Sequence, residues 1–400
     1  MKQIRIISLC LTLLVLFSAC SGQDRIAGTQ TELPAVSVPE PEPVLPDSGT
    51  PDKPQTPSDE PQLSAEEQRI FEIVSSMTLE EKVGQMFLVR CPTAGMAEAC
   101  SEYAFGGYVL FAPNIDGKDK LSLRQELDDL QAAADIDLLI AVDEEGGTVC
   151  RLSSFAAFRD SRFPSPAQLY AAGGWDAISN DIKEKCGLFR EVGVNVNLAP
   201  VCDVVTDPSA FMYKRAFGGS AEGTAEYAVL CTTGYAEERI GAVLKHFPGY
   251  GNNADTHVDT ASDNRTLEYL EQNDLLPFHK AIEAGASAIM VAHNIIACLD
   301  DEMPASLSPK VHAYLREEMG FDGVIVTDAL DMGAISAYAD NESAAIAAVL
   351  AGNDLLCCTD YAQQIPAVIQ AVKDGTIPTE IIDSAVARIL RWKMQLGIVS

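Results

Sequence analysis

The chain has 400 residues, with 28 Lys and Arg against 58 Asp and Glu, a formal net charge of −30 and a pI near 4.4. A phosphate backbone would repel so acidic a chain, which argues against nucleic acid as a partner. The length suits two or three average domains, or one large barrel with additional segments.

The N-terminal segment 1–20 has the pattern of a secretory signal. A short positively charged region precedes an apolar run over residues 6–17, which is too short for a comfortable membrane span. Small residues and Cys20 follow, and the segment resembles a bacterial lipobox with Cys20 as the lipidated residue. Ordinary cleavage near Ala19 is the alternative. We expect an exported protein whose lipid anchors it to the outer face of the bacterial cell membrane.

Residues 21–63 are rich in Pro, Ser, Thr, Asp and Glu and offer little apolar surface to bury. This composition predicts a disordered, partly polyproline tether. At ~3.1 Å per residue when extended, the tether could reach on the order of 100 Å from the membrane. The composition becomes globular over residues 64–400, where we expect the functional domain.

The chain contains 11 cysteines, which would suggest disulfides in an exported protein. Removing Cys10 and Cys20 leaves an odd number, and no CxxC pair occurs. Cys91 and Cys100 are the best candidates for a disulfide. Several others stand in apolar runs, where cysteine acts as a small hydrophobic residue, so unpaired thiols fit the pattern better than disulfides or a metal cluster.

Short apolar, β-branched runs alternate with helical patterns along the globular part. The runs cover residues 83–90, 106–112, 137–143, 194–201, 241–246, 287–293, 323–328 and 354–358. Helical patterns between them include residues 121–134, 176–193, 221–240 and 270–285. Strand and helix alternating in this way predict an α/β fold of the (β/α)₈, TIM-barrel-like type. A doubly wound open sheet is the weaker alternative, because no GxGxxG motif follows an early strand.

Polar side chains stand at five successive strand ends: Asp143, Asp203, His246, His293 and Asp328. In a barrel these ends converge on the C-terminal face, where barrel active sites are built. Any one of these residues could be a helix cap or a turn former. Their convergence favours a functional site over capping.

The segment KHFPGYGNNADTHVD (245–259) holds two of the five histidines. His246, Asp255, His257 and Asp259 could be metal ligands, as in a metal-dependent barrel hydrolase. However, the first predicted strand carries no H-x-H pair, and a Gly/Asn-rich loop is a poor frame for a rigid zinc site. We therefore favour a site without a metal.

Several motifs occur in a fixed order along the barrel. They are VDEEGG (142–147), NLAPVCDV (197–204), KRAFG (214–218), KHFPGYG (245–251), DTH (255–257), MVAHN (290–294), PASLS (304–308) and VTDAL (326–330). Together they resemble family 3 glycoside hydrolases, in particular the bacterial β-N-acetylglucosaminidase branch. The resemblance runs from about residue 75 to the end, without the second α/β domain of many relatives, and therefore implies a single-barrel form.

This resemblance implies a retaining, exo-acting enzyme that removes terminal β-linked N-acetylglucosamine without a cofactor. Asp328 matches the family's nucleophile, although capping of the following helix is an alternative role for it. His257 would be the acid/base, and Asp255 would orient its ring.

Six further residues fall on positions that the resemblance assigns to the sugar pocket: Asp143, Arg151, Arg215, Lys245, His246 and His293. For Arg151 and His293 a structural role is the alternative. The chain departs from the family pattern at Thr148, where Arg is frequent, at Tyr250, where His is common, and at 252–253, where Asp-Thr is common. These departures could change the loop's conformation or the preference for the aglycone.

Three other functions stay open at this point. Phosphate could replace water as the acceptor, because a neutral imidazole base does not repel an anion, and the substrate could be a β-glucoside. A lipid-anchored sugar-binding protein is the non-enzymatic alternative, but the chain has only two tryptophans and 7% aromatics, which is sparse for a stacking cleft.

Overall fold

The computed structural model describes residues 63–251, 261–336, 338, 340–358 and 360–399. The predicted signal, the lipidated Cys20 and nearly all of the tether lie outside the described residues, as do Asp255 and His257. In the part of the chain that the structure describes, no helix is long and apolar enough to cross a membrane.

Eight parallel strands form one sheet in the order β10-β1-β2-β3-β4-β5-β7-β9. They are β1 (Phe87–Arg90), β2 (Gly107–Leu110), β3 (Leu139–Val142), β4 (Val196–Asn197), β5 (Gly241–Phe247), β7 (Ala288–Val291), β9 (Val324–Thr327) and β10 (Leu356–Cys358). A parallel bridge between Val326 and Leu355 brings β9 beside β10 and nearly closes the ring. Each predicted apolar run coincides with one of these strands, although β5 extends one residue beyond its run, so the predicted TIM-like barrel is confirmed.

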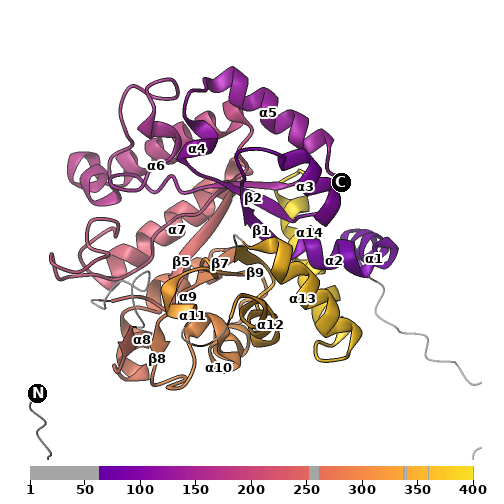
Figure 1. Ribbon diagram of the computed structural model, residues 1–400. Coiled ribbons are helices and arrows are strands. Elements are labelled where there is room, and N and C mark those ends of the chain that lie inside the picture. The colour runs from indigo at the N-terminus through magenta and orange to yellow at the C-terminus, as the bar shows by residue number, and fades with distance from the viewer. Residues whose placement is uncertain (1–62, 252–260, 337, 339, 359, 400) are drawn as a thin grey trace, which may run out of the picture. The chain divides into compact units, whose positions relative to one another are not determined.

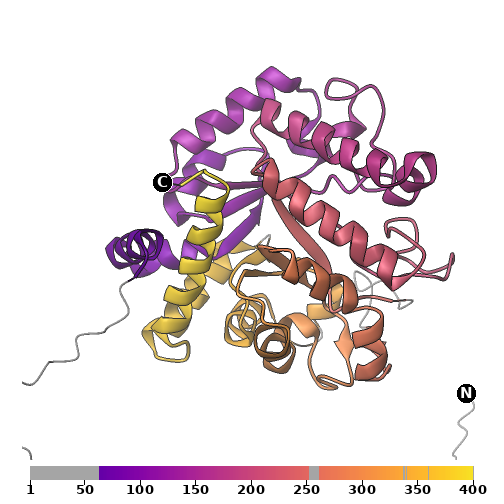
Figure 2. The same ribbon diagram turned by 180° about the vertical axis from the view of Figure 1, so that it is seen from behind.

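Helices surround this sheet on its outer side, as Figures 1 and 2 show from opposite directions. They are α1 (Ala65–Ser76), α2 (Leu79–Gln85), α3 (Met96–Tyr103), α4 (Ala112–Ile115), α5 (Lys120–Ala132), α6 (Pro166–Val192), α7 (Ala221–Glu237), α8 (Leu267–Gln272), α9 (Leu276–Glu283), α10 (Pro309–Ala313), α11 (Gly333–Ser336), α12 (Asn341–Ala351), α13 (Tyr361–Lys373) and α14 (Thr379–Gln395). Two short strands, β6 (Ser262–Asp263) and β8 (Ile295–Ile296), pair outside the barrel. Helix α6 leaves helical geometry at Gly173 and Gly174.

Local side-chain chemistry explains two of the differences between the predicted segments and the structure. The run 83–90 does not begin as a strand, because a capping box between Thr78 and Glu81 starts α2, which continues through Gln85. The helix predicted over 270–285 is two helices, α8 and α9. Pro277 stands at the start of α9, where its missing N–H costs nothing, whereas inside a continuous helix it would remove a hydrogen bond.

The cysteines of the described part are all free, and most are buried. Cys91 and Cys100, the best disulfide candidates, are both buried thiols without a bridge. Burial raises the pKa of Cys91 to about 12. The disulfide considered for Cys91 and Cys100 is therefore absent, and most of the free cysteines act as small core residues, as was predicted for those in apolar runs.

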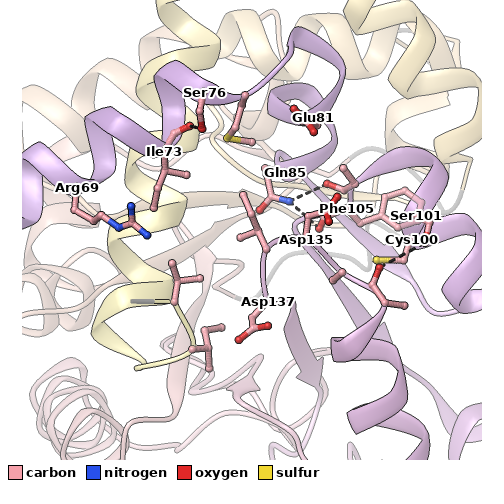
Figure 3. A pocket seen from close by; sticks show the side chains of 17 residues that line it. Arg69, Ile73, Ser76, Glu81, Gln85, Cys100, Ser101, Phe105, Asp135 and Asp137 are labelled. Atoms are coloured by element: carbon pink, nitrogen blue, oxygen red, sulfur yellow. Dashed lines mark hydrogen bonds between the residues drawn. The ribbon is translucent and has the colours of Figure 1, made fainter.

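A polar cavity of ≈ 550 Å³ lies at the opposite end of the barrel from the predicted site, below the start of β1, β2 and β3 (Figure 3). Gln85 is its central group. Its amide nitrogen donates to the backbone oxygens of Ala104, at 2.8 Å, and Phe105, at 3.1 Å. Its side-chain oxygen accepts a hydrogen bond from the ammonium of Lys393 at 2.8 Å. These bonds tie α14 to the bottom of the barrel, which is a structural role.

Lys393 should make stability depend on pH. Burial lowers its pKa to about 7 from 10.5, and the Asp137 carboxylate offsets this only in part. Between about pH 7 and pH 10 the unfolded chain holds one more proton here than the folded chain, so the free energy of unfolding rises with pH. In Lys393→Met this rise should shrink by about 2–4 kcal/mol between pH 6 and pH 10 in urea titrations.

The exposed Lys373 offers a control for this prediction. Lys373→Met should leave the pH dependence as in the wild type, because its ammonium pairs with Glu80 at the surface. Equal pH dependence in Lys393→Met and the wild type would contradict the buried-ammonium interpretation.

Candidate active site

A cavity of ≈ 670 Å³ opens at the C-terminal end of the strands. Six of the predicted site residues line it: Asp143, Arg151, Arg215, Lys245, His246 and Asp328. Of the five polar residues predicted at strand ends, Asp203 and His293 instead lie fully buried behind the wall. The structure therefore confirms that the strand ends converge, with some residues at the surface of the cavity and others supporting them.

The loop after β3 is folded around the carboxylate of Glu144. This buried carboxylate accepts hydrogen bonds from the backbone N–H groups of Arg151, at 2.9 Å, and Leu152, at 2.7 Å, and from the hydroxyl of Ser153. Gly146 has φ +103°, and a Cβ there would lie 2.2 Å from the backbone oxygen of Pro164. The loop thus turns back on itself and brings Arg151 over the end of its own strand.

Glu145, the next carboxylate, holds two cations of the cavity in place. It binds Arg215 through two bonds, Nε–Oε2 at 2.9 Å and Nη2–Oε1 at 2.6 Å, and the Lys245 ammonium lies 2.7 Å from Oε1. Burial pushes the pKa of Glu145 up, but the charges of Lys245 and Arg215 outweigh it and hold the pKa well below its ordinary value. Glu145 is thus a permanent counter-ion beneath the cavity floor.

Lys245 joins this counter-ion to Asp143. Its ammonium also donates to Asp143 Oδ1 at 2.8 Å, while Arg151 Nη2 donates to Asp143 Oδ2 at 3.1 Å. Burial acts to lower the pKa of Lys245, but Asp143 and Glu145 together raise it above its ordinary value. Charged donors and acceptors therefore alternate across the floor, a pattern suited to the directional hydrogen bonds of hydroxyl groups.

His246 is oriented by the buried Asp203. His246 Nδ1 lies 2.8 Å from Asp203 Oδ2, and the backbone N–H of Tyr250 donates to Asp203 Oδ1 at 2.7 Å. Because a carboxylate accepts only, Nδ1 carries the proton, and in the neutral ring Nε2 is left as an acceptor on the cavity side, 3.4 Å from Arg215 Nη2. Tyr250 is buried, and its ring packs edge-on against the imidazole, with 5.2 Å between the two ring centroids. It therefore supports His246 and does not line the cavity.

Asp328 stands directly after β9. Its backbone N–H donates to the oxygen of Val291 at 2.9 Å, and its Oδ1 accepts a hydrogen bond from the N–H of Ala329 at 2.8 Å. Burial acts to raise the pKa of Asp328, but His293, His246 and the Ala329 N–H hold it below its ordinary value. The nearest following helix, α11, begins only at Gly333, so Asp328 is not the helix cap considered above.

His293 supports this carboxylate from behind. Its Nε2 lies 2.8 Å from the backbone oxygen of Ala329, and its Nδ1 lies 2.7 Å from the hydroxyl of Ser306. The carbonyl accepts only, so Nε2 donates to it and Nδ1 accepts from Ser306 in the neutral ring. The structural alternative for His293 is therefore the better description: it fixes the backbone next to Asp328.

Sequence reasoning missed the supporting carboxylates. Glu144 and Glu145 belong to the VDEEGG motif, and Asp203 stands after the fourth strand, but their sequence positions alone indicate no supporting role. A signal was present, because Asp143, Glu144 and Glu145 form a run of three acidic residues directly after a fully apolar strand, and those that are buried need partners. Within the described residues no group of three or more His, Cys, Asp and Glu side chains is arranged to hold a metal ion.

An α/β barrel with an ionised carboxylate, an oriented imidazole and paired cations around one cavity defines an enzyme of the barrel hydrolase class. A family model described as the glycosyl hydrolase family 3 N-terminal domain matches residues 78–392. The chain belongs to this family and is therefore a glycoside hydrolase.

Curated relatives agree with the family model. A β-hexosaminidase of Methylococcus capsulatus is 35% identical over 280 residues, which are 68% of this chain and 81% of that protein. A β-hexosaminidase of Pseudomonas aeruginosa is 36% identical over 265 residues, which are 64% of this chain and 76% of that protein.

Solved structures share the fold. A family 3 β-N-acetylglucosaminidase from Paenibacillus superposes with a TM-score of 0.76 at 31% identity, over 81% of this chain and 63% of that one. A β-N-acetylhexosaminidase from Beutenbergia cavernae superposes with a TM-score of 0.71 at 26% identity, over 80% of this chain and 99% of that one. The barrel thus matches almost the whole of one solved structure and about two thirds of the other.

Proposed function

We propose that the protein is a retaining, exo-acting β-N-acetylglucosaminidase that hydrolyses terminal β-linked N-acetylglucosamine. The observation that carries the proposal is the ionised carboxylate of Asp328 in one cavity with Asp143, Arg215, Lys245 and His246. The names of the β-hexosaminidase relatives support this substrate class.

The reaction runs in two steps. Asp328 attacks the anomeric carbon, a C–O bond to its carboxylate forms, and the bond to the aglycone oxygen breaks as His257 gives that oxygen a proton. Water then attacks the same carbon, His257 takes a proton from it, and the carboxylate leaves. Two inversions at one carbon retain the β-configuration. Asp255 orients the His257 ring, and both assignments rest on the resemblance of the DTH motif.

The remaining residues of the cavity bind the sugar. Asp143 accepts hydrogen bonds from hydroxyl groups, and Lys245, Arg215 and Arg151 donate to them. Their mutual ion pairs hold the side chains in place before substrate arrives, so little ordering is needed on binding. His246 Nε2 adds an acceptor whose direction Asp203 fixes.

Export and lipid anchoring through Cys20 place the proposed enzyme outside the cell membrane, where peptidoglycan-derived saccharides carry terminal N-acetylglucosamine. This assignment of substrate and location rests on the N-terminal pattern and the family resemblance. The alternatives are a β-N-acetylglucosaminide phosphorylase, a β-glucosidase and a sugar-binding lipoprotein.

One assay separates these functions. With 4-nitrophenyl β-N-acetylglucosaminide in phosphate-free buffer, we expect turnover and free N-acetylglucosamine, with the glucoside turned over far more slowly. Added phosphate should not convert the product to the sugar 1-phosphate, and a chelator should not reduce the rate. A requirement for phosphate identifies the phosphorylase, a preference for the glucoside identifies the glucosidase, and binding without turnover identifies the sugar-binding protein.

A further inference from the structure

A cluster of three charged side chains lies outside the residues that line the catalytic cavity. Its centre is Arg265, which stands between β6 and α8. Arg265 Nε donates to both oxygens of Asp263 at 2.9 Å, and the two Nη atoms donate to Asp274 at 2.8 and 3.1 Å. Asp263 and Asp274 are only 2% and 1% exposed, so each carboxylate needs a charged partner, which Arg265 supplies. We call these three residues the arginine clamp.

The clamp contacts the chain just before the segment 252–260, which lies outside the described residues. Gly251 packs against the guanidinium, since a Cβ there would lie 2.5 Å from Arg265 Nη2. Gly249 packs against Asp274 in the same way, since a Cβ there would lie 2.9 Å from the Cβ of Asp274. Both glycines have positive φ, +54° at Gly251 and +121° at Gly249, and the chain can therefore approach the clamp closely.

The clamp also holds the chain just after this segment. Asp263 belongs to β6, and its backbone oxygen accepts a hydrogen bond from the N–H of Ala297 at 2.9 Å. The backbone oxygen of Ala261 accepts a hydrogen bond from the N–H of Ile295 at 2.8 Å. The side chain of Arg265 therefore joins the two ends of the segment to each other.

We propose that Arg265 is a positioning residue for the acid/base step of the reaction. This inference rests on the proposed function, because the segment between the two anchored ends contains Asp255 and His257. When both ends of a short segment are held, fewer conformations are open to the residues between them. The clamp thus restricts where the His257 imidazole can lie relative to the glycosidic oxygen. A misplacement of about 1 Å at a reacting group can cost about 10²-fold in rate.

Arginine is suited to this role because of its shape. Its planar fork binds one carboxylate along each of two edges, whereas an ammonium is a single point charge. Arg265→Lys therefore keeps the positive charge beside Asp263 and Asp274 but removes the fixed geometry. Removing the cation altogether would leave two buried carboxylates without it and would endanger the fold, so the lysine variant is the better test.

The test compares a β-linked disaccharide of N-acetylglucosamine with the dinitrophenyl glycoside of the same sugar. Only the disaccharide needs a proton on its leaving oxygen. In Arg265→Lys, kcat/KM should fall about tenfold on the disaccharide and less than about twofold on the dinitrophenyl glycoside. Added to His257→Ala, the same substitution should cost nothing further on the disaccharide, because placing an imidazole has no value once the imidazole is removed.

Arg316→Lys is the matched control. Arg316 is also partly buried and donates to a buried carboxylate, Asp354, at 2.6 Å, but it lies beside the beginnings of β9 and β10, at the opposite end of the barrel from the cavity. Arg316→Lys should change kcat/KM by the same factor on both substrates, because a loss of stability affects both alike. A loss in Arg265→Lys that is equal on both substrates, or that multiplies with the loss in His257→Ala, would overturn the positioning role.

A second variant keeps the test open if Arg265→Lys does not fold. Asp274→Asn removes one charge of the clamp and leaves the pair with Asp263 intact. It should lower kcat/KM on the disaccharide about threefold and leave the dinitrophenyl glycoside unchanged. Equal losses on the two substrates would again overturn the positioning role.

The two proposals fail in different ways. If His257→Ala loses rate equally on both substrates, the acid assignment of the proposed function is wrong, and the positioning role falls with it. If His257→Ala loses rate on the disaccharide alone but Arg265→Lys does not, only the positioning role is wrong.

Discussion

Asp328→Asn should reduce kcat/KM by at least about 10⁴-fold on every substrate, whatever its leaving group. The amide has nearly the same shape and can still accept the Ala329 N–H, but it cannot form the covalent glycosyl-enzyme at a useful rate. The loss should fall on kcat, and the variant should still bind the product N-acetylglucosamine in a calorimetric titration, because the hydroxyl-binding groups of the cavity are unchanged.

Asp331→Asn is the control for this substitution. It removes a carboxylate from the wall of the same cavity, three residues further along the chain. Its effect on kcat/KM should be at least about 100-fold smaller than that of Asp328→Asn, because it makes no bond to the reacting carbon. Comparable losses in the two variants would indicate a general electrostatic effect of the cavity and would contradict the nucleophile assignment.

His257→Ala should produce a loss that depends on the leaving group. For a natural disaccharide the departing alkoxide needs a proton, so kcat/KM should fall by about 10²–10⁴-fold. For a dinitrophenyl glycoside, whose phenolate leaves without a proton, the first step should be nearly unaffected. Steady-state rates on both substrates, with pre-steady-state bursts on the activated one, measure the difference.

Asp255→Asn is the companion variant. It should lower kcat/KM on the disaccharide by a smaller factor than His257→Ala does, because Asp255 acts through the imidazole of His257. If the loss in His257→Ala is the same for the disaccharide and the dinitrophenyl glycoside, His257 is not the acid, and another group of the cavity must supply the proton.

The barrel could be predicted because its signal is repeated. Each strand is short and mostly apolar and is followed by a polar residue or a turn, and each helix has its own pattern. The prediction from patterns failed at two places, where local interactions determined the structure. The capping box of Thr78 and Glu81 converted the beginning of the first run into helix, and Pro277 divided one predicted helix into two. A hydrophobicity pattern does not show such effects. They are predicted only when the capping pair or the helix-starting proline is itself identified in the sequence.

For the site, the residues that line the cavity were predictable, but the residues that support them were not. Motif order assigned nine residues to one site, and six of them line a single cavity in the structure. The roles of Glu145 and Asp203 were not predictable, because each acts through a partner far away in the chain, whereas Glu144 binds groups of Arg151, Leu152 and Ser153 in its own loop. Glu145 meets Arg215 at a separation of 70 residues, and Asp203 meets His246 at a separation of 43. Contacts between residues so far apart cannot be predicted from sequence spacing.

The central claim is that the carboxylate of Asp328 becomes covalently bound to the sugar and that the product keeps its β-configuration. A slow, activated N-acetylglucosaminide with a 5-fluoro substituent should accumulate the intermediate, which peptide mapping by mass spectrometry can locate. We predict one added glycosyl group on the peptide that contains Asp328 and, with an ordinary substrate, the β-anomer as the first product in proton NMR. A first product of α-configuration, or a glycosyl group attached to any other residue, would contradict the account.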